Sequence, residues 1–267
     1  WWALIIAVVF EISELVCVAC VPERPVACDE KPGKISDMFK ALFKNDQAMT
    51  VVVSIILVYT SLNICGNLVL YFFRFDVGNE GAYSIFAAVA FAAQVLVMMV
   101  IPLLRKRFSK SQLFISGFII QISGFAVILI MAFAKLYTPQ SWYILCLPGI
   151  LIYLGYGMLN VIMTIFLSDS VDYGEVMNGT REESVIFSMQ TFTVKLASGV
   201  AVFLAGLVVD WIHLDTAAAV QTQDTLDALR MWMTIPSVIQ LIVGIFVFKR
   251  FYKLDDARME EIKSKLN

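Results

Sequence analysis

Charged side chains gather in one part of an otherwise apolar chain. The acids Asp169, Asp172 and Glu175 and the arginine Arg181 follow one apolar run, and Lys195 lies well inside the next. Charge inside a membrane span is costly, so it indicates a function by default. Acids at the end of one span can form ion pairs with basic residues at the end of another, whereas a lysine in mid-span can pair with an acid, a cation site or a substrate.

A basic segment that begins at Arg105 ends another apolar run, on the same predicted side of the membrane as the acids. Opposite charges at helix ends on one face can hold that face closed. Such pairs are individually weak when they are exposed, which suits a gate that must open. The alternative is a loop of separately solvated charges. The gate hypothesis names five residues, which are Arg105, Asp169, Asp172, Glu175 and Arg181.

Polar side chains recur at helical spacing in three apolar runs, so each set shares one helix face. Tyrosine and asparagine suit a polyhydroxylated ligand, because the ring stacks on the apolar face of a sugar while amide and hydroxyl groups bond its OH groups. The alternative is hydrogen bonding between helices, which Ser, Thr and Asn commonly provide in membranes. The predicted substrate-binding residues are Tyr59, Asn63, Asn67, Tyr153, Tyr156, Asn160, Thr191 and Lys195.

The depth of Lys195 in its span decides how it is interpreted. It lies about 11 residues from the start of the run, and therefore about 16 Å deep at 1.5 Å per residue. That is near the midplane of a hydrocarbon core roughly 30 Å thick, where snorkelling to the surface is difficult. We expect Lys195 to line a water-filled cavity. A structural lysine paired with a buried acid or with carbonyl groups is the alternative.

The composition is that of a polytopic membrane protein. Of the 267 residues, 60% are hydrophobic and 16% are charged, whereas soluble domains have roughly 45–50% and about 25%. The net charge of -2 gives no bulk attraction for nucleic acid. Cys17 and Cys20 form a CxxC pair in an apolar run, far in sequence from His213, the only histidine. We therefore expect no metal site and no bound cofactor.

Seven runs are long enough to span a membrane, which takes about 20 apolar residues. They are 1–21, 47–73, 83–104, 113–134, 142–167, 185–212 and 231–250. The segment 35–44 has an apolar face opposite two lysines, which is typical of an interfacial helix. Two pairs of glycines seven residues apart, Gly117 with Gly124 and Gly199 with Gly206, predict close contacts between helices.

The sequence therefore predicts an all-α polytopic membrane protein without a soluble domain. Its expected parts are one transmembrane helix (1–21), a central loop with an amphipathic helix (22–46), a six-helix transmembrane bundle (47–250) and a short tail (251–267). Sixteen of the 20 lysines and arginines lie on the side of the central loop and the tail, which predicts that both are cytoplasmic. With that orientation an odd number of spans must precede Trp1, so we expect the chain to be part of a longer protein.

The charged stretch also resembles a known pattern. The run Asp169-Ser170-Val171-Asp172-Tyr173-Gly174-Glu175 is followed by Gly179-Thr180-Arg181-Glu182-Glu183-Ser184 and then by Phe192-Thr193-Val194-Lys195. Together they resemble the glycoside–pentoside–hexuronide:cation symporters, the melibiose-permease-like branch of the major facilitator superfamily. The resemblance covers the whole chain. It implies that the chain holds helix six, the central loop and the C-terminal six-helix bundle, without the N-terminal bundle.

The resemblance also implies an activity. Two six-helix bundles would rock around a site at the midplane, and a cation gradient would drive the movement of a sugar. Lys195 would lie close to the sugar and cation sites, while Asp169, Asp172 and Arg181 would belong to a charged network at the inner face. The acids that bind the coupling cation, Na+ or H+, would lie mainly in the first bundle, which is absent here.

We therefore expect the C-terminal half of a sugar:cation symporter in the plasma (inner) membrane. Its expected partners are a sugar or glycoside, membrane lipid and the missing N-terminal helix bundle. An uncoupled sugar facilitator and a non-transporting sensor of the same fold are the alternatives. An intramembrane enzyme is disfavoured, because the six-helix part shows no histidine-rich metal set, nucleophile motif or pair of intramembrane carboxylates.

Overall fold

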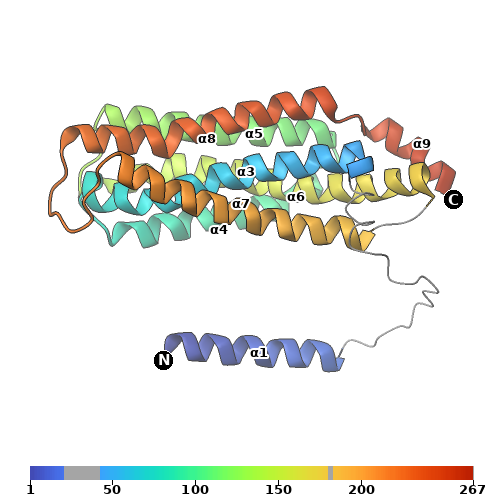
Figure 1. Cartoon of the computed structure of the whole chain (residues 1–267), viewed down its shortest axis with the longest axis horizontal. Helices are drawn as coiled ribbons and strands as arrows, with labels where there is room; N and C mark the ends of the chain where they lie inside the picture. The colour runs from blue at the N-terminus through green and yellow to red at the C-terminus, as the bar shows by residue number, and fades with distance from the viewer. Residues whose placement is uncertain (21–42, 180–182, 267) are drawn as a thin grey trace. The chain divides into compact units, whose positions relative to one another are not determined.

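The structure, a computed structural model, describes residues 1–20, 43–179 and 183–266 of the chain (Figure 1). Within these residues it contains helices and no strand. Seven of the helices are long and apolar enough to cross a membrane, which confirms the predicted fold class. The chain divides into two compact units, Trp1–Asp37 and Met38–Asn267, and each is described by itself.

The first unit contributes one described helix, α1 (Trp2–Cys20), in which no residue is buried. Its 19 residues extend about 28 Å at 1.5 Å per residue, close to the thickness of a hydrocarbon core of about 30 Å. Glu11 and Glu14 are exposed on this helix. Most of the predicted interfacial helix 35–44 lies outside the described residues.

The second unit contains the other six spanning helices and a shorter terminal helix. In chain order they are α3 (Asp46–Tyr71) with its continuation, the π-helical turn η1 (Phe72–Val77); α4 (Ala82–Leu104); α5 (Lys110–Phe133); the 3-10 turn η2 (Trp142–Leu145), which leads into α6 (Cys146–Asn178); α7 (Glu183–Trp211); α8 (Gln223–Phe251); and α9 (Asp256–Leu266). The six long helices lie side by side, and α9 lies at one end of them (Figure 1). We call this end the α9 end and the opposite one the far end.

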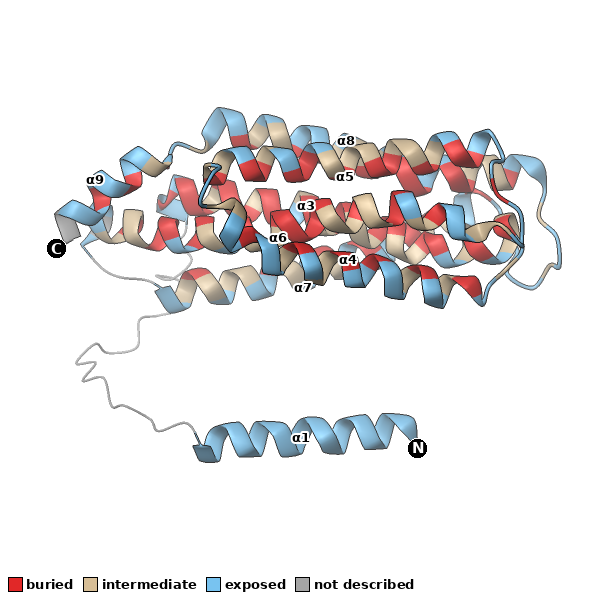
Figure 2. Ribbon diagram, turned by 180° about the vertical axis from the view of Figure 1, so that it is seen from behind, coloured by how far each residue is buried: buried red, intermediate tan, exposed pale blue. Residues whose placement is uncertain are grey.

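Buried residues fill the spaces between these helices, while many outward faces are exposed (Figure 2). α6 packs against α4 and α5, and α3 packs against α7 and α8. Large apolar side chains such as Phe91, Ile119 and Phe246 remain exposed. Such surfaces suit contact with lipid tails, which are as apolar as the side chains themselves.

Two helices extend beyond the apolar runs that predicted them. α6 continues through Asn178 and ends at Gly179, whose φ of 72° is the left-handed conformation that stops many helices. Asp169, Asp172 and Glu175 are therefore all helical. For these three acids the structure contradicts the alternative of a loop of separately solvated charges. α8 begins after Thr222, whose side chain accepts a hydrogen bond from the Thr225 N–H. Hydropathy marks the apolar part of a helix, whereas caps mark its ends.

The contact between α5 and α6 depends on glycine. A Cβ atom at Gly124 would lie 2.7 Å from the backbone of α6, and one at Gly155 would lie 2.6 Å from the carbonyl oxygen of Gly117. These distances confirm the close contact predicted for the first glycine pair. Gly199 and Gly206 make no such contact among the described residues, where a Cβ atom at either would meet nothing within 4 Å, so that prediction is not confirmed.

A buried ion pair joins η1, the end of α3, to α8 at the far end. The Nε and Nη2 atoms of Arg230 donate to the two carboxylate oxygens of Asp76 at 2.7 and 2.5 Å, and Nη1 donates to Asp227 at 2.7 Å. The side chains of Arg230 and Asp76 are 2% and 5% exposed. Because the guanidinium presents its donors as a rigid fork, this two-bond geometry fixes the relative orientation of the two helices.

Tyr137, in the connection between α5 and α6, donates its hydroxyl to Asp76 at 2.7 Å. Burial and the adjacent Asp76 carboxylate raise the pKa of the Tyr137 hydroxyl, so it keeps its proton and remains a donor. Three elements therefore converge on one carboxylate. We call Asp76, Tyr137, Asp227 and Arg230 the far-end ion cluster.

Replacing Asp76 with Asn should lower the free energy of unfolding by about 3–5 kcal/mol, because the Arg230 charge would stay buried without its counter-ion. Unfolding of the purified chain in detergent measures the change. The matched control is Glu80→Gln, which breaks the ion pair between Glu80 and Arg74, whose side chains are 59% and 43% exposed. This control should cost less than about 1 kcal/mol. Equal stability of Asp76→Asn and the wild type would contradict the prediction.

Candidate functional site

Three of the predicted substrate-binding residues touch one another. The rings of Tyr59 in α3 and Tyr156 in α6 meet edge to face, with centroids 5.5 Å apart. The Nδ2 atom of Asn160 donates to the Tyr59 hydroxyl at 2.5 Å. This contact joins α3 to α6 through groups that can also exchange hydrogen bonds with sugar hydroxyls.

The two predicted asparagines of α3 use their amide NH2 groups within the helix. Asn63 donates to the Tyr59 carbonyl and Asn67 donates to the Asn63 carbonyl, each at 2.7 Å. Their Oδ1 atoms have no hydrogen-bond donor among the described residues. These oxygens are therefore available as acceptors for a ligand.

The other predicted residues lie apart from this contact. Tyr153 lines a small apolar cavity with Cys65 and Tyr83. Thr191 is exposed and donates to a carbonyl of its own helix at 3.3 Å. Lys195 is also exposed, and its ammonium has no ion-pair partner in the described part of the chain. The eight residues thus extend along α3, α6 and α7 rather than forming one compact pocket.

α7 rests on α3 through small side chains. Its buried residues include Ala197, Ala201 and Ala205, each four residues apart, and small residues let two helices approach closely. Gln190, which the sequence reasoning did not single out, links α7 to α6 by donating from Nε2 to the Thr164 hydroxyl oxygen at 3.3 Å. Gln190 directly precedes Thr191 in the sequence, but it does not share the helical spacing by which the polar residues of α7 were chosen.

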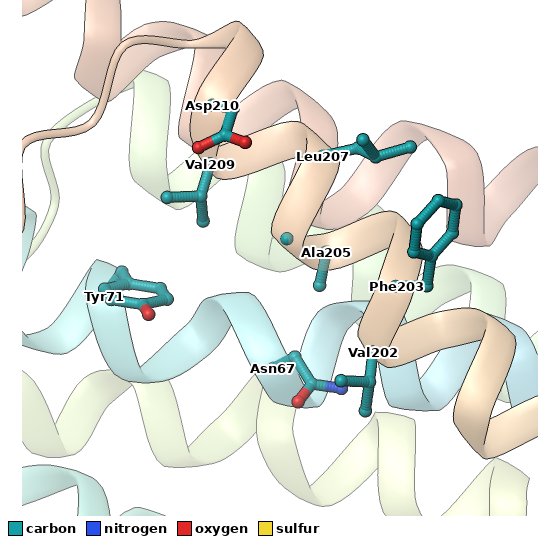
Figure 3. Close-up of a pocket in the computed structure, with 9 residues that line it drawn as sticks. Asn67, Tyr71, Val202, Phe203, Ala205, Leu207, Val209 and Asp210 are labelled. Carbon is teal, nitrogen blue, oxygen red and sulfur yellow. The ribbon is translucent and has the colours of Figure 1, made fainter.

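A cavity of about 550 Å³ lies between α3 and α7 toward the far end (Figure 3). Asn67 and Tyr71 line it from α3, and Asp210 lines it from the last turn of α7. Gly206 also lines it, and the absence of a side chain there leaves room. Tyr71 continues the four-residue spacing of the predicted polar residues Asn63 and Asn67 on α3. Asp210 could not be found by helical spacing, because it stands at the margin of its apolar run.

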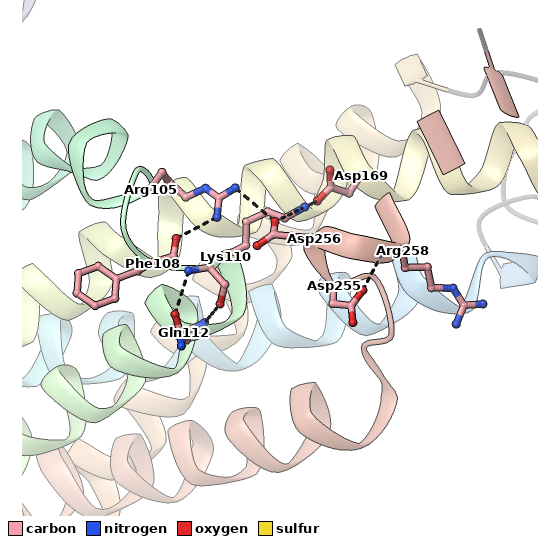
Figure 4. A network of polar contacts seen from close by, with 9 residues as sticks. Arg105, Phe108, Lys110, Gln112, Asp169, Asp255, Asp256 and Arg258 are labelled. Atoms are coloured by element: carbon pink, nitrogen blue, oxygen red, sulfur yellow. Dashed lines mark hydrogen bonds and ion pairs between the residues drawn. The ribbon is translucent and has the colours of Figure 1, made fainter. Parts of the chain in front are cut away.

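A second ion cluster lies at the α9 end (Figure 4). Lys110, at the start of α5, forms an ion pair with Asp169 of α6 and lies 3.4 Å from the Asp256 carboxylate of α9. Arg105, directly after α4, also lies 3.4 Å from Asp256. The side chains of Lys110 and Asp169 are 6% and 7% exposed. We call Arg105, Lys110, Asp169 and Asp256 the α9-end ion cluster.

The predicted gate residues belong to this cluster only in part. Arg105 and Asp169 are both in it, but each pairs with a residue that the sequence reasoning had not named. Asp172 and Glu175 follow Asp169 along α6 and are half-buried. Arg181 lies outside the described residues.

α9 is held to the bundle by apolar contacts as well as by charge. Leu254, Met259 and Ile262 are buried, and Tyr173 and Tyr252 pack against them. Burial raises the pKa of the Tyr252 hydroxyl, so this ring stays uncharged at neutral pH. The tail therefore has an apolar side that anchors it to the bundle.

The charge of Asp256 is set by two opposing effects. Burial raises the pKa of this carboxyl, but the positive charges of Lys110 and Arg105 outweigh burial and lower it overall. Asp256 is therefore ionised at neutral pH and attracts both basic side chains. Because its pKa in the folded chain lies below the ordinary value of about 3.9, its stabilising effect is complete above that value and is lost as the pH falls through the lower folded value.

Both ion clusters had weak signals in the sequence. Lys110 and Asp169 are 59 residues apart, and Arg230 and Asp76 are 154 apart. Each of these charges stands at the margin of an apolar run, where an unpaired charge is costly. The signal shows that a partner is needed, but it does not say which helix provides it.

The polar groups on α3, α6 and α7 are hydroxyl, amide, carboxylate and ammonium groups. Among the described residues, no three His, Cys, Asp or Glu side chains lie together in a way that could hold a metal ion. What the arrangement offers is hydrogen bonding and aromatic contact, which bind and orient a polyhydroxylated molecule.

Comparison with known proteins identifies the family. Residues 2–256 match the family described as MFS/sugar transport protein. The chain belongs to this family. Its resemblance to the melibiose-permease-like symporters is thereby confirmed. Members of the family are transporters, which removes the alternative of an intramembrane enzyme.

Several curated relatives are similar along most of this chain. It is 24% identical over 254 residues to the uncharacterized symporter YjmB of Bacillus subtilis, covering 94% of this chain and 54% of that protein. It is 23% identical over 234 residues to the raffinose carrier protein of Pediococcus pentosaceus, with 87% and 35% covered. It is 26% identical over 255 residues to the isoprimeverose transporter of Lactiplantibacillus pentosus, with 95% and 51% covered. The chain thus spans about half the length of these relatives, or less.

Acid should release α9 from the bundle only below about pH 4, where Asp256 loses its charge. The measurement is the hydrogen-exchange protection of the α9 amides, which should be constant from about pH 7 to about pH 5. Asp256→Asn should reduce this protection at neutral pH about two- to fivefold, as expected for a partly exposed ion pair. Glu260→Gln, at an exposed position of the same helix, is the control and should match the wild type. Unchanged protection in Asp256→Asn would show that the charge does not hold α9.

Proposed function

We propose that the six-helix bundle forms one wall of a sugar:cation symporter, and that a further helix bundle of the same protein forms the other wall. Family membership supports this proposal, as do relatives named as a raffinose carrier and an isoprimeverose transporter. The chain also spans about half of their length, or less. In transporters built from two repeats, substrate binds between them near the midplane. The proposed substrate is a sugar or glycoside, and membrane lipid surrounds the outer faces.

The observation that carries the proposal is the polar face shared by α3, α6 and α7. Asn63 presents an acceptor without a donor, and Lys195 presents a charge without an ion-pair partner among the described residues. Lipid would make both groups costly, because hydrocarbon cannot replace their hydrogen bonds. If a second wall faces these groups across a water-filled space, water can hydrogen-bond to both of them and this cost disappears. Polar groups in that position can bind substrate.

Within this wall the proposed roles follow from the contacts. The hydroxyl groups of Tyr59 and Tyr156 and the amide of Asn160 would bind sugar hydroxyls. The two tyrosine rings would face the apolar side of the sugar. Thr191 and Lys195, on the exposed side of α7, would contact the sugar or the site of the coupling cation. Tyr153 has a smaller part, because it lines a separate apolar cavity.

The α9-end ion cluster is the proposed gate, and we place that end in the cytoplasm. Opening this end would separate Arg105 and Lys110 from Asp256, a pairing that is partly exposed and therefore inexpensive to break. The coupling cation, Na+ or H+, would be bound mainly by the other wall. An uncoupled facilitator is distinguished by one result, which is sugar uptake that is indifferent to both Na+ and pH gradients.

In the protein that contains both walls, Lys195→Ala should reduce cation-driven sugar uptake about tenfold or more, since a hydrogen bond to a charged group is worth roughly 1.5–3 kcal/mol. Uptake of radiolabelled raffinose into vesicles with an imposed Na+ or pH gradient measures the effect. Lys249→Ala, at an exposed position near the end of α8, is the matched control. Unchanged coupled uptake would remove Lys195 from the mechanism.

Residues 1–267 alone, reconstituted into liposomes, should show no cation-coupled sugar uptake, because one wall cannot enclose a substrate between two bundles. The protein with both walls, reconstituted in the same way, is the positive control. Coupled uptake by the chain alone would contradict the two-wall arrangement.

A further inference from the structure

We infer that the cavity between α3 and α7 is a second carbohydrate site, which binds one neutral sugar ring toward the far end of the wall. The inference rests on the proposed function, because it assigns a further part of the same wall. The cavity volume of about 550 Å³ falls within the roughly 300–1,000 Å³ typical of small-molecule sites.

Three oxygen-bearing side chains line this cavity. Asn67 and Tyr71 come from α3 and Asp210 comes from α7, so the two helices supply polar groups from opposite sides (Figure 3). The Oδ1 atom of Asn67, the hydroxyl of Tyr71 and the carboxylate of Asp210 have no hydrogen-bond or ion-pair partner in the described part of the chain. Asn67 and Tyr71 are half-buried and Asp210 is exposed, so these atoms can be reached by a ligand and can exchange hydrogen bonds with it.

The chemistry of these groups favours sugar hydroxyls. A carboxylate accepts hydrogen bonds at two oxygens, the amide oxygen accepts another, and the tyrosine hydroxyl both donates and accepts. Val202 and Ala205 add apolar surface that the C–H face of a sugar ring can cover, as the ring of Tyr71 can. The site thus matches a ligand that is rich in O–H donors and has one apolar face.

The charge of the cavity selects among sugars. Its lining residues include one acid, Asp210, and no lysine, arginine or histidine. A sugar acid would bring a negative charge close to this exposed carboxylate, and no lysine, arginine or histidine among the lining residues offsets the repulsion between the two like charges. The site therefore takes neutral sugars and disfavours hexuronates and sulfonated sugars.

The far-end site is separate from the mid-span part of the wall. Lys195 and Asp210 lie on one helix about 15 residues apart, which corresponds to about 22 Å along its axis. One sugar ring cannot contact both. The wall therefore has a cationic position at mid-depth and an acidic position near the far end.

Trp211 provides a local reporter for the test, because it directly follows Asp210 and its ring lies 5.8 Å from the ring of Trp232. The purified full chain in detergent is titrated with two matched pairs of probes, galactose with galacturonate and glucose with glucuronate. At least one neutral sugar should change the fluorescence saturably, and its acid counterpart should bind about tenfold more weakly or worse. Trp211→Phe should remove the signal.

Variants then locate the site. Asp210→Ala and Tyr71→Leu should each weaken binding of the neutral sugar about tenfold. Asp210→Asn keeps the size of the side chain but removes its charge. It should therefore reduce the ratio of the affinity for galactose to the affinity for galacturonate. The control is Asp224→Asn, which changes an exposed acid in the first turn of α8 and should bind like the wild type. Thermal melting in the same detergent shows whether each variant is folded.

Three results would overturn the inference: unchanged affinity for the neutral sugar in folded Asp210→Ala and Tyr71→Leu, tighter binding of galacturonate than of galactose by the wild type, or no saturable response of the wild type to a neutral sugar. None of these depends on transport. If the far-end site binds as expected but the protein with both walls moves no sugar, the proposed function fails while the site stands.

Discussion

The ion pair between Asp76 and Arg230 is the interaction on which the arrangement of the bundle depends. A buried ion pair next to hydrocarbon cannot exchange its bonds for water, so separating the two charges costs far more than separating a surface pair. Its two hydrogen bonds set the orientation of α8 against the end of α3. The hydroxyl of Tyr137 adds the connection between α5 and α6. One carboxylate thus joins three elements, and a buried hydrogen bond from the Ser237 hydroxyl of α8 to the Ser61 carbonyl of α3 supports the same packing.

The two ends of the bundle use charge in different ways. At the far end, Asp76 has fixed and buried partners. At the α9 end, Lys110 lies between Asp169 and Asp256, and the side chain of Asp256 is 42% exposed. Water can replace some of the contacts of Asp256 at the α9 end, but it cannot replace those of Asp76 at the far end. The far end is therefore suited to stay intact while the α9 end rearranges, and the polar face of the wall lies between them.

Part of this arrangement could be read from the sequence. Hydropathy found the spanning helices, because lipid requires a long apolar run, and helical spacing placed Tyr59, Tyr156 and Asn160 on faces that meet. The ion pairs could not be predicted, because they depend on which helices are neighbours. That choice is made by close packing at small residues and by partners such as Asp76 and Arg230, which are 154 positions apart. The ends of α6 and α8 also lay beyond hydropathy, since a glycine and a threonine cap determine them.

The way α7 is seated has a mechanical consequence. Three alanines, Ala197, Ala201 and Ala205, are among the buried residues of α7, which packs against α3, and their small side chains let the two helices approach closely. α8, in contrast, is also held at the far end by the ion pair between Arg230 and Asp76. Lys195 and Asp210 are fixed to the same rod, so any axial displacement moves a cation and an anion by the same amount. An axial shift at one of these charges is therefore transmitted to the other, because both belong to one continuous helix.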